Sequence, residues 1–145
     1  MLSVIHQRHL STFVGRVVLS TEDKLFTYLK MAYLNDLTMS SHEYESHDCT
    51  SAKAKFIIEL KCRNIHYGDL LLEADKYKAL VDAANALGYT PWYVNSTPQG
   101  VYAFNLSKIK VTWTIKRLPA HTHFSNGEYV SKTVTYLKIT QAQRL

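Results

Sequence analysis

Two residues of opposite charge end an apolar segment near the middle of the chain. Residues 56–61 read Phe-Ile-Ile-Glu-Leu-Lys, so Glu59 and Lys61 follow three apolar side chains. An apolar run of this length is typical of a central strand that is covered on both faces. Residues two apart in a strand project from one face, which predicts that Glu59 and Lys61 share a face with Ile57 and that the other three side chains lie opposite. Charges on such a strand are costly unless they are paired or solvated, which indicates a functional site.

A second acid, Asp48, lies eleven residues before Glu59. If residues 44–49 and 56–61 form a hairpin, Asp48 lies beside Glu59 on the neighbouring strand. Two adjacent carboxylates repel each other, and Mg²⁺ (or Mn²⁺) would relieve the repulsion because it binds one or two carboxylates together with water and phosphate oxygens. The metal would polarise a phosphate and acidify a water, while Lys61 would orient or deprotonate that water. The expected chemistry is hydrolysis of a phosphodiester bond.

A helix is predicted before this segment and carries a further acid. Ser20 or Thr21 is expected to cap a helix that runs to about Leu34, with acids in its first turn where the helix dipole favours them. Glu22 falls on the apolar stripe of this helix, three residues before Leu25, which is an unusual place for an acid.

A second helix is predicted to end at Leu87, because apolar residues repeat at helical spacing from Tyr77 and Gly88 follows as a C-terminal cap. Lys76 lies beside the apolar stripe of this helix. Residues 70–72 fit either the start of the helix or a short strand.

The second half of the chain is predicted to be rich in strands. Residues 91–95 and 101–106 flank a Ser-Thr-Pro-Gln-Gly segment and indicate a hairpin. Residues 108–116 alternate between apolar and polar, which predicts a half-buried strand with three lysines on its outer face. Residues 129–140 alternate again and are expected to pair with that strand. The element order therefore predicts an α/β fold, a mixed β-sheet flanked by helices with an extra C-terminal β-hairpin.

Positive charge is concentrated in the last quarter of the chain. Residues 1–106 carry ten Lys and Arg against eleven Asp and Glu, a balance of −1, and residues 107–145 carry seven against one, a balance of +6, which gives the net +5. Basic residues interleaved with aromatic ones suit a polyanion such as nucleic acid, although a solvated strand surface would show the same pattern. The expected nucleic-acid contacts are Arg63, Lys108, Lys110, Lys116 and Arg117.

Composition limits the class of protein. A chain of 145 residues, 46% apolar and 20% charged, is expected to form one domain, 1–145. Its two cysteines do not make a disulfide framework, and no apolar stretch approaches the roughly 18 residues of a membrane helix. The N-terminal segment lacks the apolar region of a secretory signal. We expect a cytoplasmic protein without a membrane partner.

Asp48 and the segment Phe-Ile-Ile-Glu-Leu-Lys-Cys-Arg at 56–63 resemble the PD-(D/E)xK nuclease superfamily, which includes restriction enzymes, Holliday-junction resolvases and phage endonucleases. The resemblance covers roughly residues 20–106. It implies a restriction-endonuclease-like core there, followed by a basic β extension over 107–145. It also implies a Mg²⁺-dependent DNA endonuclease and, by analogy with resolvases, a homodimer able to cut two strands.

The resemblance further implies roles for individual residues. Asp48 and Glu59 would be metal ligands, and Lys61 would act on the water. Thr21-Glu22-Asp23-Lys24 is similar to the corresponding segment of phage junction-resolving endonucleases, which implies that Glu22 joins the metal site, often through water. Lys76 would complete the site. The sequence departs from the family pattern in having no proline before Asp48, which follows Ser46-His47, so that Glu43 and Glu45 are substitutes.

Two other functions remain open at this stage. The first alternative is a non-catalytic nucleic-acid-binding or assembly protein on a nuclease-like fold. A zinc-stabilised domain is a third interpretation, since His121-Thr122-His123 is a plausible ligand pair, but Cys49 and Cys62 are isolated and a surface loop explains the histidines better. The sequence does not distinguish DNA from RNA, or branched from linear substrates.

Overall fold

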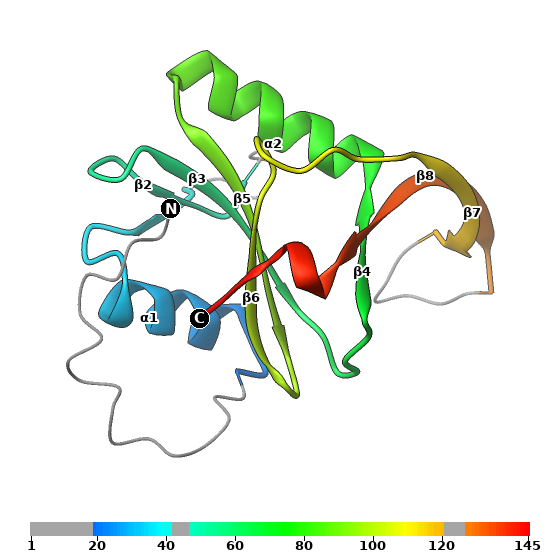
Figure 1. The fold of residues 1–145 in the computed structure, drawn as a ribbon, viewed down its shortest axis with the longest axis horizontal. Helices are drawn as coiled ribbons and strands as arrows, with labels where there is room; N and C mark the ends of the chain where they lie inside the picture. Colours follow the sequence, from blue (N-terminus) through cyan, green and yellow to red (C-terminus); the bar gives the residue numbers. More distant parts are fainter. Residues whose placement is uncertain (1–18, 42–46, 121–126) are drawn as a thin grey trace.

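The computed structural model describes residues 19–41, 47–120 and 127–145, which form two helices and two β-sheets (Figure 1). The larger sheet has six strands in the order β1-β2-β3-β5-β6-β9, and the smaller sheet has three in the order β4-β8-β7. The elements in chain order are α1 (Glu22–Ala32), β1 (Thr38–Met39), β2 (Cys49–Ser51), β3 (Phe56–Cys62), β4 (Asp69–Glu73), α2 (Ala74–Leu87), β5 (Thr90–Thr97), β6 (Gly100–Asn105), β7 (Thr114–Pro119), β8 (Tyr129–Lys138), a 3₁₀ turn (Ile139–Gln141) and β9 (Gln143–Arg144).

The larger sheet is mixed, and helices cover both of its faces. Strands β3 and β5 are parallel, whereas the other pairs in this sheet are antiparallel. Helices α1 and α2 lie on opposite sides of the sheet (Figure 1). The predicted fold class, a mixed α/β sheet flanked by helices, is confirmed.

Strand β3 is the centre of the core, and its residues alternate between the two faces as predicted. Phe56, Ile58 and Leu60 pack in one buried cluster with Leu25 of α1. Ile57 packs in the other cluster, with Leu80 of α2 among its members. Full burial of an aliphatic side chain of this size stabilises the fold by about 1.5–3 kcal/mol. The two clusters therefore fix β3 between the helices.

Both helices begin or end where local signals place them. Thr21 caps α1, because its hydroxyl accepts a hydrogen bond from the Lys24 N–H at 3.2 Å. Gly88 ends α2 in the left-handed conformation (φ 68°), and the Tyr89 N–H donates to the Ala84 carbonyl at 2.8 Å. Leu87, in the last turn of α2, is 58% exposed and does not continue the buried stripe.

The structure decides two further points of the second half. Residues 70–72 belong to strand β4, which pairs with β8, and Leu70 and Leu72 are buried in the cluster that also contains Leu80 of α2. The predicted hairpin over 91–106 is confirmed as β5 and β6, with Thr97 opposite Gly100.

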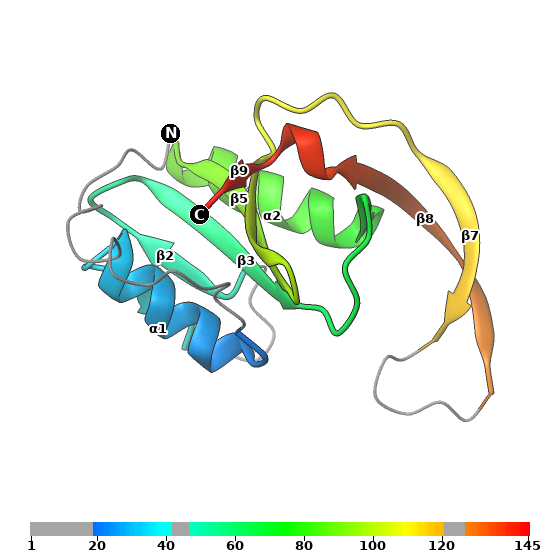
Figure 2. The ribbon, with the colours of Figure 1, turned by 60° about the horizontal axis from the view of Figure 1, so that its bottom comes forward.

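The strand predicted over 108–116 is wrong in extent and in burial. Strand β7 begins only at Thr114, since Ile109 and Val111 pack against the α2-side cluster instead of pairing with β8. Ile115 is 71% exposed, because β7 lies at the edge of the smaller sheet, and that sheet curves away from the helices (Figure 2). The predicted pairing between the two late strands is confirmed for β7 and β8.

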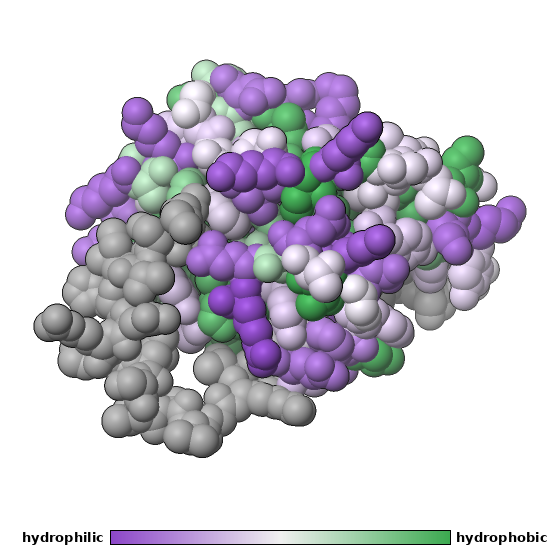
Figure 3. Space-filling model, viewed as in Figure 1, coloured by the Kyte–Doolittle hydropathy of each residue, from purple (hydrophilic) through white to green (hydrophobic). Residues whose placement is uncertain are grey.

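The surface seen in Figure 3 is mainly hydrophilic, with hydrophobic residues scattered between. No helix in the described part of the chain is long and apolar enough to cross a membrane. Residues 44–46, the start of the segment expected to form a hairpin with 56–61, fall outside the described residues.

Candidate active site

Asp48 and Glu59 lie close together on neighbouring chain segments. Cys49, the first residue of β2, pairs with Ile58 of β3 in an antiparallel register, and Asp48 is the residue just before that strand. The Asp48 N–H donates to the Ile58 carbonyl at 3.1 Å. Asp48 Oδ2 accepts the Leu60 N–H at 2.7 Å. These bonds hold Asp48 against β3, where its carboxyl group shares a hydrogen bond with that of Glu59.

The Glu59 carboxyl group is strongly perturbed. Its side chain is only 10% exposed. Burial and the charge of Asp48 raise the pKa of Glu59 to about 7, and a hydrogen bond with the Asp48 carboxyl adds to the rise. Lys76, whose Nζ lies 2.9 Å from Glu59 Oε1, acts against the rise but does not outweigh it. Near neutral pH, Glu59 therefore holds a proton in part of the molecules.

Lys76 is positioned by the first turn of α2. Its side chain is 48% exposed, so it reaches Glu59 from the solvent side. Burial lowers the pKa of Lys76, but the hydrogen bond to Glu59 and the charges of Glu59 and Asp48 outweigh this and raise it. Lys76 thus remains a cation at the edge of the site.

Glu22 and Lys61 stand at the edge of the same group. Glu22 is in the first turn of α1, and burial followed by the charge of Asp48 raises its pKa, while the charge of Lys61 acts in the opposite direction. Lys61, near the end of β3, is partly buried. Its ammonium group forms no hydrogen bond or ion pair with another described residue, which leaves it available to a ligand.

These side chains line one cavity of about 770 Å³. Arg63 and Tyr93 line it as well. The smaller sheet contributes further lining residues, among them Lys132 of β8 and Leu118 near the end of β7. Sequence reasoning missed Lys132 and its ion-pair partner Glu73 (3.0 Å), because the two are 59 positions apart and no local pattern joins them.

Arg63 lines the cavity but is already bound to the protein. Its Nε donates to Asn95 Oδ1 at 2.7 Å, and its Nη2 donates to the Leu71 carbonyl at 2.7 Å and to the Tyr93 hydroxyl at 3.1 Å. The guanidinium group joins β4, β5 and the end of β3. The geometry favours a structural role over the predicted phosphate contact.

The other predicted nucleic-acid contacts do not share one strand face. Lys108 and Lys110 precede β7 in the chain, and consecutive residues Lys116 and Arg117 within β7 project from opposite faces. Lys116 Nζ lies 5.8 Å from the centre of the Tyr136 ring. Arg117 Nη2 donates to the Tyr129 carbonyl at 3.2 Å. The expected row of lysines on a single strand is therefore wrong.

The donor set suits a divalent cation held by few protein ligands. Within residues 19–41, 47–120 and 127–145, no three His, Cys, Asp or Glu side chains are gathered closely enough to enclose an ion. Mg²⁺ is commonly bound by only one or two carboxylates, with water and phosphate oxygens completing its shell. Asp48 and Glu59 offer such a pair. The substitutes Glu43 and Glu45, and His121 and His123, fall outside the described residues.

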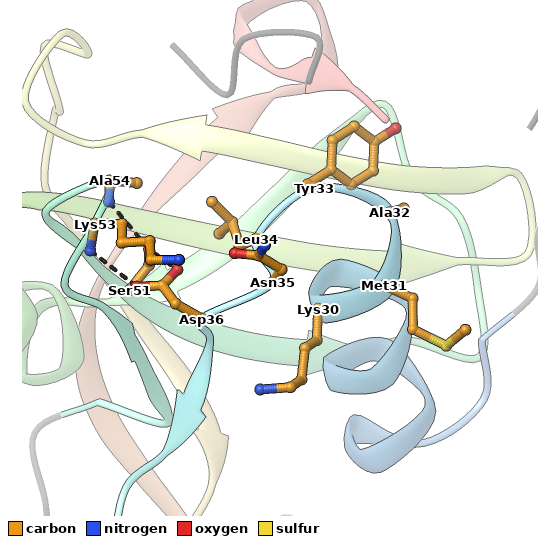
Figure 4. A pocket seen from close by; sticks show the side chains of 10 residues that line it. All are labelled: Lys30, Met31, Ala32, Tyr33, Leu34, Asn35, Asp36, Ser51, Lys53 and Ala54. Carbon is orange, nitrogen blue, oxygen red and sulfur yellow. Dashed lines mark hydrogen bonds between the residues drawn. The ribbon is translucent and has the colours of Figure 1, made fainter. Parts of the chain in front are cut away.

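A second cavity of about 470 Å³ lies at the C-terminal end of α1 (Figure 4). The carboxylate of Asp36 lines this cavity, and it already has hydrogen-bond donors within the protein. It accepts from the Ser51 hydroxyl at 2.7 Å and from the Lys53 N–H at 2.8 Å. These bonds join the segment before β1 to the turn between β2 and β3. The cavity holds no pair of groups with evident chemistry.

Comparisons with known proteins identify little. No family model matches the chain, and no curated protein is similar enough to count as a match. Among solved structures, Hjc from Archaeoglobus fulgidus, a Holliday junction resolvase from an archaeal hyperthermophile, is similar with 15% identity and a TM-score of 0.48. The likeness covers 75% of this chain and 76% of that one. At this TM-score the activity of the neighbour does not transfer to this chain.

Proposed function

We propose that the chain is a metal-dependent nuclease that hydrolyses phosphodiester bonds, with DNA as its substrate. The observation that carries the proposal is the pair of adjacent carboxyl groups, Asp48 and Glu59, in one cavity with the ammonium groups of Lys61 and Lys76. Two carboxylates offer ligands for a divalent cation, and two ammonium groups offer partners for a phosphate. The arrangement also resembles the motif of the PD-(D/E)xK superfamily at Asp48, Glu59 and Lys61, with the departure that no proline precedes Asp48.

Each residue would have a distinct task. Asp48 and Glu59 would hold Mg²⁺ or Mn²⁺, with Glu22 acting through water. The bound metal would supply Lewis acidity toward the phosphate and its leaving oxygen. Lys61 would orient the attacking water and stabilise the charge that develops on the phosphate. Lys76, half exposed at the mouth of the cavity, would hold a non-bridging phosphate oxygen.

A nicking assay on supercoiled plasmid tests the proposal. We expect cutting with Mg²⁺ or Mn²⁺ and none with EDTA. Glu59→Ala and Lys61→Ala should abolish cutting while DNA binding is retained. Lys78→Ala is the matched control, since Lys78 lies in α2 close to Lys76 in sequence but pairs with Asp82 outside the cavity. Loss of cutting in the control as well would mean that the variants report on folding and not on chemistry.

One observation favours the runner-up, a nucleic-acid-binding or assembly protein without cleavage. Glu59 is paired with Lys76, and Asp48 accepts the Leu60 N–H, so both carboxyl groups have partners within the protein. If the wild-type protein binds DNA and leaves it intact with every divalent metal, the runner-up replaces the nuclease.

The wider organisation also belongs to this proposal. Residues 1–145 would act as one nuclease domain, with the core over about 20–106 and the basic extension over 107–145 as its substrate-contacting part. A homodimer would allow cutting of two strands. Sedimentation with and without a DNA duplex tests the oligomeric state.

A further inference from the structure

Strands β7 and β8, which we call the β-arm, carry two lysines directly opposite each other. Lys116 of β7 pairs with Lys132 of β8 in the antiparallel register. Opposite residues share a face, as do residues two apart, such as Lys116 and Leu118. Lys132 and Leu118 both line the cavity that contains Glu59. Lys116 therefore lies on the arm face that carries cavity residues. The arm curves away from the core beside α2 (Figure 2).

This lysine pair places two like charges at one point of the β-ladder. Like charges directly opposite each other destabilise a β-ladder, and the side chain of Lys132 is only 25% exposed, which limits screening by water. Glu73 is an acid that pairs with Lys132, at 3.0 Å, whereas the contact of Lys116 is the Tyr136 ring. Glu73 is thus placed against Lys132, and no ion pair with a described residue is formed by Lys116. An anion bound between the two lysines would reduce the repulsion between them.

The anion can be identified by what else lines the cavity. Lys61 and Lys76 line the same cavity as Lys132, so that several cations face one space. A polymer with a negative charge on every unit can contact several of them at once, and a nucleic-acid backbone has this property. Resting on the proposed function, we propose that Lys116 and Lys132 form a second phosphate subsite, which holds the backbone of the same nucleic acid at a phosphate away from the bond to be cut.

Binding in EDTA tests the subsite without any cleavage. The probe is a short fluorescein-labelled DNA duplex, measured by anisotropy over a range of salt concentrations, with the single strand of the same sequence as a second arm. Lys116→Gln and Lys132→Gln should each weaken duplex binding several-fold and lower the slope of log K against log [salt] by about 0.9, the value for one lost phosphate contact. The double variant should lower the slope by about 1.8. Lys138→Gln, on the same strand outside the cavity lining, makes the same change in net charge and should leave the slope unchanged.

Two controls separate binding from folding. Removal of Lys132 leaves Glu73 without its partner, so thermal unfolding is measured for each variant. Lys132→Arg keeps the charge and should restore the slope. If Lys132 only pairs with Glu73, Lys132→Gln will lower the melting temperature and leave the slope at the wild-type value. This result would overturn the inference.

The remaining outcomes are also decisive. If Lys116→Gln and Lys132→Gln have the same slope as Lys138→Gln while the wild type still cuts plasmid, the subsite is wrong and the nuclease stands. If the slopes fall as expected but the wild type cuts nothing, the nuclease is wrong and the subsite stands as part of a binding protein. If polyglutamate displaces the duplex and depends on the two lysines to the same degree, the surface binds an acidic protein, and the subsite is wrong.

Discussion

Replacement of Glu59 by glutamine should stabilise the metal-free protein at alkaline pH. The pKa of Glu59 is raised from its ordinary 4.5 to about 7, first by burial and then by the charge of Asp48. An acid with a raised pKa stabilises the fold fully below its unfolded pKa, and this contribution is lost as the pH rises through the folded value. Glutamine has the shape of the protonated acid and no charge. The variant should therefore keep, at pH 8, the stability that the wild type has only near pH 4.5.

The magnitude follows from the two pKa values. Their difference is about 2.5, and at 1.36 kcal/mol for each pKa unit this gives about 3 kcal/mol. Glu59→Gln should exceed the wild type by about this amount at pH 8, by about 2 kcal/mol at pH 6 and by little near pH 4.5. For a chain of this length, 3 kcal/mol corresponds to roughly 10 °C in melting temperature. Lys76 loses its partner, but its half-exposed side chain is solvated, so this loss costs little.

Urea unfolding in EDTA from pH 5 to pH 8 measures the effect. Glu73→Gln is the matched control, because Glu73 also pairs with a lysine but is 42% exposed, and its replacement should give no gain at pH 8. Added Mg²⁺ should stabilise the wild type and have little effect on Glu59→Gln. The free energies of unfolding of Glu59→Gln and the wild type could differ by a constant amount across the pH range, or the variant could be the less stable protein at pH 8. Either result would refute the argument that the fold disfavours the ionised form of Glu59.

Three further predictions concern single residues. Arg63→Ala should lower the free energy of unfolding by about 2–4 kcal/mol, because Asn95 and the Leu71 carbonyl lose a charged donor; urea unfolding measures it, and a loss below 0.5 kcal/mol would contradict the structural role. Lys61→Met should reduce plasmid nicking at least a hundred-fold with unchanged melting temperature; retained nicking would exclude Lys61 from the chemistry. Gly88→Ala should cost about 1 kcal/mol, measured by thermal unfolding, since φ is 68°; a neutral effect would mean that the cap adjusts.

The parts of the fold that the sequence predicts are those governed by near neighbours. The alternation of Ile57, Ile58 and Glu59 follows from the two-residue period of a strand, and it is observed. The meeting of Asp48 with Glu59 needs only a hairpin between adjacent segments. The start of α1 follows from its N-terminal capping residue Thr21, and the end of α2 follows from its C-terminal capping residue Gly88. In each case the information lies within about a dozen residues.

The parts that the sequence does not predict depend on distant partners. Residues 108–116 alternate as a strand should, but Ile109 and Val111 pack against the apolar cluster on the α2 side, and pairing with β8 begins only at Thr114. Lys132 gives no local signal, because its position in the cavity depends on β8 pairing with β4 on one side and β7 on the other. Tertiary packing overrides local periodicity where a chain segment can reach a competing core.

The cations in the cavity and on the neighbouring β-arm differ in the partners that they already have within the protein. Arg63 donates to three acceptors on neighbouring strands. If its guanidinium group turned to a ligand instead, those acceptors would be left unpaired. Lys61 has no hydrogen-bonded or ion-paired partner among the described residues, and Lys116 contacts only an aromatic ring there. A polyanion can bind such ammonium groups without breaking a hydrogen bond or an ion pair within the described part of the protein. Lys76 is intermediate between these cases. A ligand that binds its ammonium group would leave the Glu59 carboxylate without its cation, and a divalent cation beside Asp48 would replace it.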